Sequence, residues 1–361
     1  MLKHAASLCL AGAILLVCAL TAASAFARGS LPDGISGLTA WSNQAVKEQL
    51  QKFPLLEQIA PTLLLGVGAK EQDGIFITEN YLLENILPVD RLTASENIAG
   101  IDQFLISRNL PAVLMLIPTA CAIKQQELPA NAVLYNQKAL ISDVYSDLAG
   151  LVTTVDAYSA LFAAKDQYTY YRTESNLTGL GGYYLYGALA SRLGLSARPL
   201  DQFEIEHLEQ DYYGDLYLRS NYKGIRPDLV TFYRFSRYDR QYFLSHTANG
   251  ETKNYYSLFP THLALLGSPV SALLGGVGQR LDISVVSPFE ESMLIFGDET
   301  ATAYLPFLAV HYGQITLVDL MQADDEQLAA IQLDDYNRVM LAFSVDYFIN
   351  NPIGERLALV P

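Results

Sequence analysis

The sequence predicts an α/β protein in which helices flank a parallel sheet, with an inserted β-rich region around residues 200–288. Two uninterrupted apolar runs, Ala112–Ile117 and Ser292–Gly297, have the pattern of strands buried on both faces of a parallel sheet. Helical periodicity follows each run, and strands that alternate with helices favour parallel pairing. Within 200–288 that periodicity gives way to short stretches of alternating polarity. We interpret them as strands carried on the main sheet and not as a separate domain.

The part of the chain before the first buried run is predicted to hold two helices and a hairpin. Apolar residues recur at helical spacing over 36–58 and again over 86–105. Between these helices, Asp73-Gly74 is a turn sequence that joins two strand-like stretches, 64–70 and 73–77.

After the first buried run, helices are assigned where apolar residues recur on one face, and strands where short apolar or alternating stretches end in turn residues. The helices are predicted at 130–148, 157–165, 180–193 and 301–311. The strands are predicted at 151–155, 168–171, 213–215, 230–235, 241–244, 315–318 and 337–343.

The chain has 361 residues, of which 51% are hydrophobic, so it can form one large domain with a sizeable core. Residues 1–27 are typical of an export signal, because Lys3 precedes an uncharged apolar stretch that ends in small residues near Ala25 and Ala27. The same stretch is long enough to stay in a membrane as an uncleaved anchor. We expect an exported protein, extracellular or associated with the cell envelope, in which residues 28–361 form a single domain.

The net charge restricts the possible binding partners, and the cysteine content restricts the possible disulfides. The net charge of −15 is spread along the chain, which argues against nucleic acid and anionic membrane surfaces as partners. Cys9 and Cys18 would leave with the signal, so Cys121 alone remains and cannot form an internal disulfide. We expect its thiol to be buried and unreactive. No cofactor and no metal site are predicted.

Two corners between a strand and a helix have the position at which α/β enzymes place catalytic groups. The first corner is residues 174–177, Glu-Ser-Asn-Leu, between a tyrosine-rich run and a glycine-rich helix start. It contains no histidine. The second corner is Gly297–Glu299, at the end of the second buried run. The helix that follows it presents backbone N–H groups and a partial positive charge, which suit an oxyanion.

An ordered set of landmarks places both corners in a family. The landmarks are Ala112–Thr119, Leu128-Pro129, Gln137-Lys138, Tyr170–Thr173, Leu180–Tyr184, Tyr213–Asp215, Tyr217, Leu274–Gly276, Gly297-Asp298, Leu305–Leu308, His311-Tyr312 and Asp319. In this order the chain resembles the DHHW family, named for the residues Asp-His-His-Trp. Its members have SGNH-hydrolase-like domains related to the O-acetyltransferases of alginate synthesis. The resemblance covers residues 35–350 and implies an SGNH-hydrolase-like fold.

Carried over position by position, the resemblance places the Asp-His-His-Trp motif on Glu174, Ser175, Asn176 and Leu177. It places the nucleophilic serine of the related enzymes on Glu299. In those enzymes the serine attacks an acyl carbonyl, a histidine takes its proton and the aspartate orients the histidine. Here a carboxylate stands in place of the hydroxyl, and an asparagine cannot accept a proton near neutral pH. The site is therefore predicted to be degenerate, with no residue assigned as catalytic.

A relocated catalytic group would have to come from the remaining hydroxyls and histidines. Ser175 and Thr300 are the hydroxyls at the two corners. The histidines outside the signal are His207, His246, His262 and His311. His311 falls on a helix, where we expect a structural role.

The carboxylates at the two corners leave three interpretations open. If the corners approach one another, Glu174 together with Asp298 and Glu299 resembles the acid pair of a glycosidase. The same oxygens suit a hard cation such as calcium. Alternatively, Asp298 caps the next helix or bonds the corner, Glu299 interacts favourably with the helix N-terminus and Glu174 is solvated. The tyrosine clusters around 168–171, 183–186 and 212–217 either stack on sugar rings or fill half-buried surfaces.

Together these observations predict an exported, non-catalytic DHHW-type protein, a pseudoenzyme. It would bind a cell-envelope polysaccharide or support polysaccharide O-acetylation by a membrane-bound O-acyltransferase, a partner implied by the resemblance alone. The alternative is an active carbohydrate O-acetyltransferase or esterase, or a two-carboxylate glycosidase, that uses groups not recognised in the sequence.

Overall fold

The computed structural model describes residues 71–361 except 90, 131, 209–210, 236–240, 266–268, 277 and 287–289. The predicted signal at 1–27, the helix at 36–58 and the strand at 64–70 lie outside the described residues. The chain divides into two compact units. The larger unit, residues 73–219 and 225–361, contains the elements that form the site.

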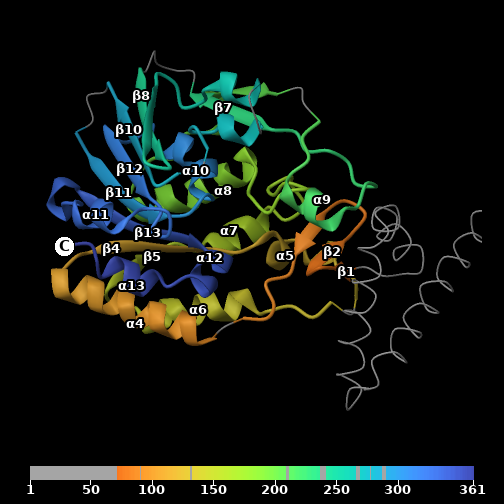
Figure 1. Cartoon of the computed structure of the whole chain (residues 1–361), viewed down its shortest axis with the longest axis horizontal. Coiled ribbons are helices and arrows are strands. Elements are labelled where there is room, and N and C mark those ends of the chain that lie inside the picture. Colours follow the sequence, from red (N-terminus) through yellow and green to blue (C-terminus); the bar gives the residue numbers. More distant parts are fainter. Residues whose placement is uncertain are drawn as a thin grey trace, which may run out of the picture. The chain divides into compact units, whose positions relative to one another are not determined.

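A central eight-stranded sheet has the order β5-β4-β13-β11-β12-β10-β8-β9 (Figure 1). In chain order its strands are β4 (Ala112–Ile117), β5 (Val152–Thr154), β8 (Tyr242–Ala248), β9 (Glu251–Tyr255), β10 (Arg280–Val285), β11 (Ser292–Gly297), β12 (Gln314–Val318) and β13 (Arg338–Ser344). Strands β5 to β12 in this order pair in parallel, whereas β10, β8 and β9 extend the sheet antiparallel. Every residue of β4 and β11 is buried, which confirms the two apolar runs as central strands.

Helices cover both faces of the sheet, and the alternation of side chains along β4 separates the two faces. Val113, Met115 and Ile117 belong to one hydrophobic core, whereas Ala112, Leu114 and Leu116 belong to the other. Helices α7 (Ala157–Ala163), α8 (Gly179–Leu193) and α10 (Ala301–Leu308) supply residues to the first core. The second core contains residues of α4 (Arg91–Arg108), α6 (Gln137–Asp147), α12 (Val345–Asn350) and α13 (Ile353–Leu357). The predicted α/β class is confirmed.

The remaining elements are short. They are β1 (Glu71–Gln72), β2 (Ile75–Ile77), β3 (Leu82–Glu84), β6 (Phe203–His207), β7 (Thr231–Phe235), α5 (Ala120–Ile123), α9 (Asp215–Ser220), α11 (Asp325–Ala329), and the 3-10 helices η1 (Gln125–Glu127), η2 (Leu200–Gln202), η3 (Thr261–Leu265), η4 (Pro269–Ala272) and η5 (Leu333–Asp335). Cys121 is buried in α5, as expected. Within the described ranges, no helix has the length and apolar character needed to cross a membrane.

Three predicted helices begin or end three or more residues inside their predicted bounds. Helix α4 begins at Arg91 and not at 86, because Pro88 and the residue before it favour extended backbone. Helix α6 begins at Gln137 and not at 130, because the side chain of Asn136 caps its first turn. Helix α10 ends at Leu308, three residues early. The helices at 157–165 and 180–193 are confirmed.

Among the predicted strands, two are wrong. Residues 168–171 form no strand but a single bridge between Tyr170 and Leu177, because the chain turns back on itself at this point. Residues 213–215 lead into α9 and not into a strand. The other predicted strands within the described residues are confirmed. Within 200–288, however, β7 pairs with β6 in a separate two-stranded sheet and is not carried on the main sheet as predicted. Asp73 and Gly74 have φ of 48° and 76°, the positive values that a two-residue hairpin turn needs.

The glycines at the start of α8 explain how the two corners are brought together. A Cβ on Gly181 would lie 2.1 Å from the carbonyl oxygen of Thr169, which precedes the first corner. A Cβ on Gly182 would lie 1.9 Å from the carbonyl oxygen of Ala303, in the helix that follows the second corner. Only residues without a Cβ fit at these distances. The glycine-rich motif therefore sets the spacing between the two corners.

Candidate functional site

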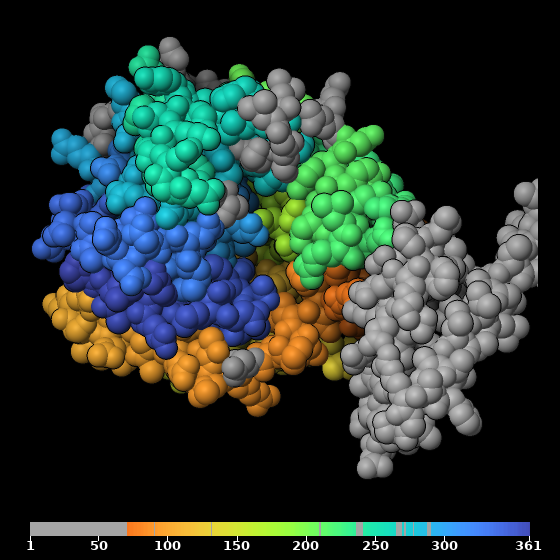
Figure 2. All heavy atoms as spheres, in the orientation of Figure 1, coloured from red at the N-terminus to blue at the C-terminus, as the bar shows by residue number. Residues whose placement is uncertain are grey.

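A cavity of about 280 Å³ lies where four parallel strands end. Thr119, Asp298 and Asp319 follow β4, β11 and β12, while Ser344 ends β13, and all four line the cavity. Ligands of open α/β sheets bind outside the carboxyl ends of the strands. In Figure 2 the surface is hollowed between the orange segment with β3, the green segment with α9 and the blue C-terminal segment.

The cavity is acidic. Among the described residues that line it there is no lysine, arginine or histidine. The lining carboxylates are Glu84, Asp298, Glu299, Asp319 and Asp346. The cavity is therefore unsuited to an anionic ligand, because like charges repel strongly where water is partly excluded.

The first corner is a loop that closes on itself. Tyr170 and Leu177 form the bridge at its base, and the backbone N–H of Tyr171 donates to the carbonyl oxygen of Asn176 at 3.1 Å. The loop therefore carries its own backbone hydrogen bonds and needs no neighbouring strand. Ser175, Asn176 and Leu177 line the cavity.

A buried carboxylate fixes the entry to this loop. Asp228 is 2% exposed and accepts hydrogen bonds from the backbone N–H groups of Arg172 and Thr173, at 2.6 and 2.8 Å. It also accepts from the hydroxyls of Thr173 and Tyr168. Four donors thus share one carboxylate, which holds the backbone immediately before Glu174.

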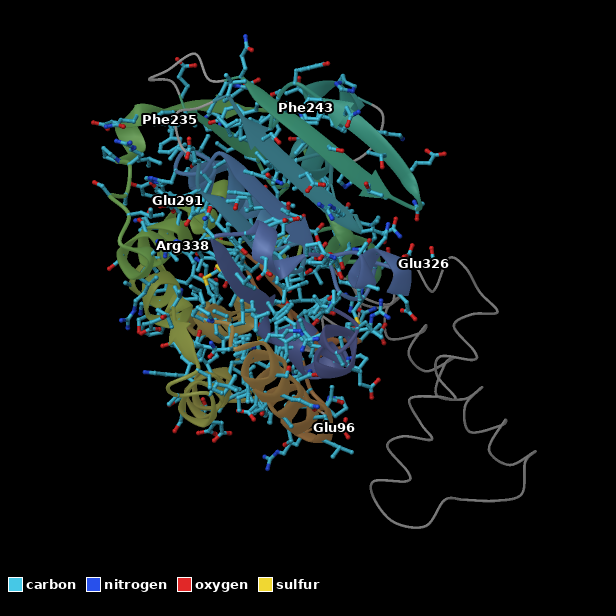
Figure 3. The ribbon with its side chains drawn as sticks, turned by 90° about the vertical axis from the view of Figure 1, so that its left-hand side faces the viewer. Glu96, Phe235, Phe243, Glu291, Glu326 and Arg338 are labelled. Carbon is cyan, nitrogen blue, oxygen red and sulfur yellow. The ribbon has the colours of Figure 1, made fainter. Side chains whose placement is uncertain are left out.

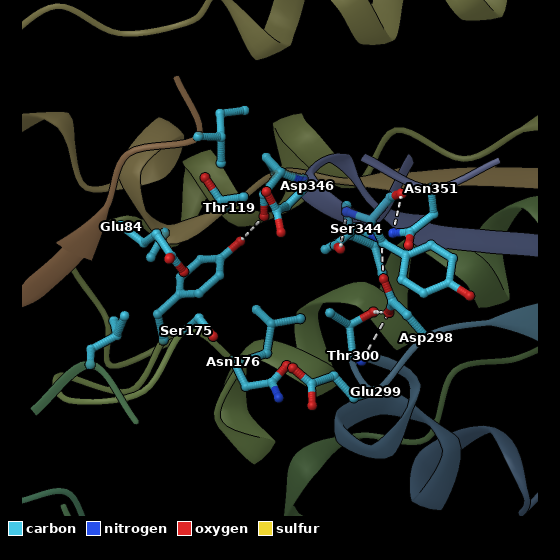
Figure 4. A pocket seen from close by; sticks show the side chains of 18 of the residues that line it. Glu84, Thr119, Ser175, Asn176, Asp298, Glu299, Thr300, Ser344, Asp346 and Asn351 are labelled. Atoms are coloured by element: carbon cyan, nitrogen blue, oxygen red, sulfur yellow. Dashed lines mark hydrogen bonds between the residues drawn. The ribbon is translucent and has the colours of Figure 1, made fainter. Parts of the chain in front are cut away.

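The two corners meet in the cavity. The side chain of Asn176 lies beside the carboxyl group of Glu299 and acts to lower its pKa. In Figure 4 these two side chains point toward one another from different elements. The position matched to a family histidine therefore contacts the position matched to the family serine. In this chain an amide and a carboxyl group occupy that contact.

Glu174 points away from the cavity and is held by the segment that leads into α9. Its Oε2 accepts from the hydroxyl of Tyr212 at 2.7 Å and from the backbone N–H of Asp215 at 3.4 Å. A Cβ on Gly214 would lie 2.5 Å from the same oxygen, so the segment packs directly on the carboxyl group. Glu174 does not line the cavity. Glu174 is therefore hydrogen-bonded and only partly exposed.

The pKa of Glu174 is raised from 4.5 to about 8, mainly by burial and in part by the neighbouring Asp215 carboxyl, because two adjacent carboxyl groups do not readily ionise together. Oδ1 of Asp215 is buried and has no hydrogen-bond partner within the described residues. Desolvation also raises the pKa of Glu299, to about 7, with a further contribution from the negative charge of Asp298. Glu299 remains exposed to the cavity, although the concave wall surrounds its carboxyl group.

These shifts predict a dependence of stability on pH. The folded chain holds the Glu174 proton up to a pKa of about 8, whereas the unfolded chain releases it near 4.5. The free energy of unfolding should therefore fall as pH rises through this window. Replacing Glu174 by glutamine removes the effect, so the stability of this variant relative to wild type should rise with pH, by at most about 1.4 kcal/mol per pH unit.

Urea unfolding of both proteins between pH 5 and 8 measures this difference. Glu326→Gln makes the same change at an exposed site on α11 and should follow the wild type at every pH. A constant difference between Glu174→Gln and wild type would contradict the assignment of the proton to Glu174.

Asp298 bonds the second corner. It is 4% exposed, and its Oδ1 accepts from the backbone N–H of Thr300 at 3.0 Å and from the Thr300 hydroxyl. Its Oδ2 accepts from the backbone N–H of Ser344 at 2.7 Å. Asp298 therefore ties the end of β11 to the end of β13. Burial raises its pKa, and these hydrogen bonds oppose that rise.

No histidine faces the cavity. His207, His246, His262 and His311 are all described, and none lines it. His311 lies on the ring of Tyr186 and shares a 2.7 Å hydrogen bond with its hydroxyl. The two hydroxyls considered from the sequence, those of Ser175 and Thr300, do line the cavity. The described residues contain no cluster of three or more His, Cys, Asp or Glu that is suited to a metal ion.

Sequence reasoning missed several residues that shape the site. Asp215 was recognised only as part of a family landmark, and its contact with Glu174 depends on how the segment before α9 folds back. Nothing in the sequence distinguishes Asp228 from other acidic residues in the β-rich region. Asp346 follows a buried strand, and this position in the sequence could have indicated a site residue. Glu84 lines the cavity from β3, and no sequence pattern indicates its role.

The protein-family model described as DHHW protein matches residues 83–318 of this chain. The chain belongs to the DHHW family. The matched stretch contains both corners, residues 174–177 and Gly297–Glu299. Among curated protein sequences, none matches this DHHW protein significantly.

Solved structures share the DHHW fold. A crystal structure of a DHHW family protein from Eubacterium siraeum matches with a TM-score of 0.65 at 19% identity, over 80% of this chain and 96% of that chain. PatB1 of Bacillus cereus matches with a TM-score of 0.64 at 14% identity, over 77% of this chain and 98% of that chain. PatB1 with a sulfonyl adduct matches with a TM-score of 0.65 at 14% identity, over 78% and 97% of the two chains. At these identities the likeness establishes the common fold.

Proposed function

We propose that this DHHW protein is exported and non-catalytic, with a degenerate SGNH-type site that binds a cell-envelope polysaccharide or supports its O-acetylation by a membrane-bound O-acyltransferase. One observation carries the proposal. Where a serine–histidine mechanism needs a hydroxyl beside an imidazole, this chain has the amide of Asn176 beside the carboxyl group of Glu299.

The chemistry of this pair supports a loss of acyl transfer. An amide cannot take the proton of a nucleophile, and among the described residues no histidine lines the cavity to replace it. Loss of the nucleophile or of the base alone typically lowers the rate by a factor on the order of 10⁴ to 10⁶. Here both are replaced, while the buried scaffold around them is intact. Retention of the cavity without its reactive groups is what a binding role would require.

The position and size of the cavity support a saccharide ligand. About 280 Å³ at the ends of the parallel strands accommodates a sugar ring, and Tyr170 and Leu216 contribute apolar surface beside the carboxylates. Export would bring the protein to cell-envelope polysaccharides. The apolar stretch within residues 1–27 supports export.

One observation favours the competing carboxylate chemistry. Glu299 faces the cavity with a pKa raised to about 7, the value expected of a general acid that works near neutral pH. A glycosidase needs a second carboxylate on the other side of the scissile bond, and Glu174 does not line the cavity. We therefore rank an active glycosidase, esterase or O-acetyltransferase below a binding protein.

Turnover of acetyl esters tests the proposal. We expect the wild type to release acetate no faster than buffer. The triple variant Glu299→Ser, Glu174→Asp, Asn176→His places the family's serine, aspartate and histidine at the matched positions, and we expect it to exceed the wild type by at least about 100-fold. The double variant Glu299→Ser, Glu174→Asp, which lacks the histidine, is the matched control and should stay at the wild-type level.

Wild-type turnover that Glu299→Gln abolishes would overturn the non-catalytic assignment. Hydrolysis of an oligosaccharide that depends on Glu299 would do the same in favour of the glycosidase.

A further inference from the structure

The charges that line the cavity are not balanced within the described part of the chain. Of the lining carboxylates, Glu84 has a cationic partner in Arg219, which also pairs with Asp215 at 3.3 Å. Glu84 is therefore neutralised by the protein itself. The other four lining carboxylates, Asp298, Glu299, Asp319 and Asp346, form no ion pair within the described residues.

Two of these four carboxylates are saturated by structural hydrogen bonds. Asp298 accepts from both sides of its corner, as described above. Asp319 accepts from the Tyr347 hydroxyl at 2.6 Å, from the Met321 N–H at 2.9 Å and from the Gln322 side chain at 2.9 Å. Neither carboxylate has a free face for a ligand.

Glu299 and Asp346 remain available. Glu299 lies beside the amide of Asn176 and is exposed to the cavity. Oδ1 of Asp346 accepts from Asn350 at 2.9 Å, and its Oδ2 forms no hydrogen bond within the described residues. Figure 4 shows the two carboxyl groups on different sides of the cavity. The cavity thus presents two separate acceptors to whatever fills it.

The separation of the two acceptors distinguishes between kinds of cation. A metal ion needs several oxygens converging on one point, and the described residues provide no such cluster. An organic cation spreads its donors over several ångströms. The apolar part of the lining, which includes Ile117, Tyr170 and Leu177, suits a ring with one apolar face.

We propose that the cavity binds an amino sugar with a free, protonated amino group, which interacts with Glu299 or Asp346 and places its hydroxyls toward the other. This inference rests on the proposed polysaccharide binding and names its chemical class. The same lining disfavours a uronate, because its carboxylate would lie beside the carboxyl groups of Glu299 and Asp346. N-acetylation of the sugar would remove the charge on which the interaction depends.

Calorimetric titration of the full chain at pH 7 and low salt tests the inference with three probes: a glucosamine tetramer, the N-acetylglucosamine tetramer and a galacturonate tetramer. We expect the glucosamine tetramer to bind at least about 10-fold more tightly than its N-acetylated counterpart, with no heat from the uronate. Glu299→Gln and Asp346→Asn should each reduce this preference at least about fivefold. Sodium chloride should weaken binding of the amine form selectively.

Glu326→Gln is the matched control. Glu326 is exposed on α11, outside the cavity lining (Figure 3), so this variant should keep the full preference for the amine. Equal affinity for the amine and N-acetylated tetramers, or a preference that survives in both cavity variants, would overturn the inference while leaving polysaccharide binding intact. Failure of all three probes to bind would overturn both the inference and the polysaccharide part of the proposed function. Ester turnover decides the non-catalytic part independently.

Discussion

Replacing Gly182 by alanine is expected to lower the free energy of unfolding by about 3 kcal/mol, near the upper end for overpacking a buried contact. The added Cβ would lie 1.9 Å from the carbonyl oxygen of Ala303 and 2.9 Å from the backbone nitrogen of Tyr304, both in α10, which packs on α8. Both atoms belong to a helix backbone, which cannot move aside as a flexible side chain can. Helix α10 must therefore shift away, and Glu299 with it. Urea unfolding measures the loss.

Gly187→Ala is the control for this prediction. It lies in the same helix, and a Cβ there would meet nothing within 4 Å. The change should stabilise the protein by about 0.5–1 kcal/mol, because alanine is the better helix former. Equal effects at both glycines would show that helix propensity, and not the close approach of α10, governs Gly182.

Replacing Asp228 by alanine is expected to lower the free energy of unfolding by about 3–5 kcal/mol. The substitution leaves two backbone N–H groups and the hydroxyls of Tyr168 and Thr173 without their acceptor in a site that water does not reach. Because Asp228 holds the backbone before Glu174, the loop of the first corner should also become mobile. Chemical denaturation gives the energy, and hydrogen exchange of the Arg172 and Thr173 amides reports the loosening.

Two variants bracket the Asp228 prediction. Asp228→Asn retains one acceptor oxygen and should cost less than the alanine change. Asp147→Ala removes an exposed carboxylate at the end of α6 and should alter stability by less than about 0.5 kcal/mol. A loss for Asp228→Ala no larger than for Asp147→Ala would contradict the role assigned to the buried carboxylate.

The parallel sheet could be predicted because its central strands are apolar on both faces. Runs such as Ala112–Ile117 have few alternative structures in a chain of this size. Prediction failed where local pattern and tertiary contact disagree. Residues 168–171 have the composition of a strand, but the loop they begin pairs with itself. Residues 213–215 alternate in polarity, but Gly214 packs on Glu174 and directs the chain into α9.

The site was predictable only in part, for a related reason. The corner Gly297–Glu299 follows a recognisable strand, so its place at the sheet edge could be inferred from the chain alone. The contact between Asn176 and Glu299 depends on how α8 packs on α10. In the sequence, only the glycines at the start of α8 indicate this packing. The orientation of Glu174 toward Tyr212 and Asp215, away from the cavity, could not be foreseen. It follows from a segment whose fold was predicted wrongly.

The self-closed loop at residues 170–177 has a consequence for how such a site can change over time. Its backbone is held by its own bridge and by Asp228, and neither depends on which side chains stand at 175 and 176. The side chains at 175 and 176 can therefore be substituted without changing the backbone of the loop. A lineage can exchange them without first rebuilding the fold, so reactivity is lost or regained more readily than shape.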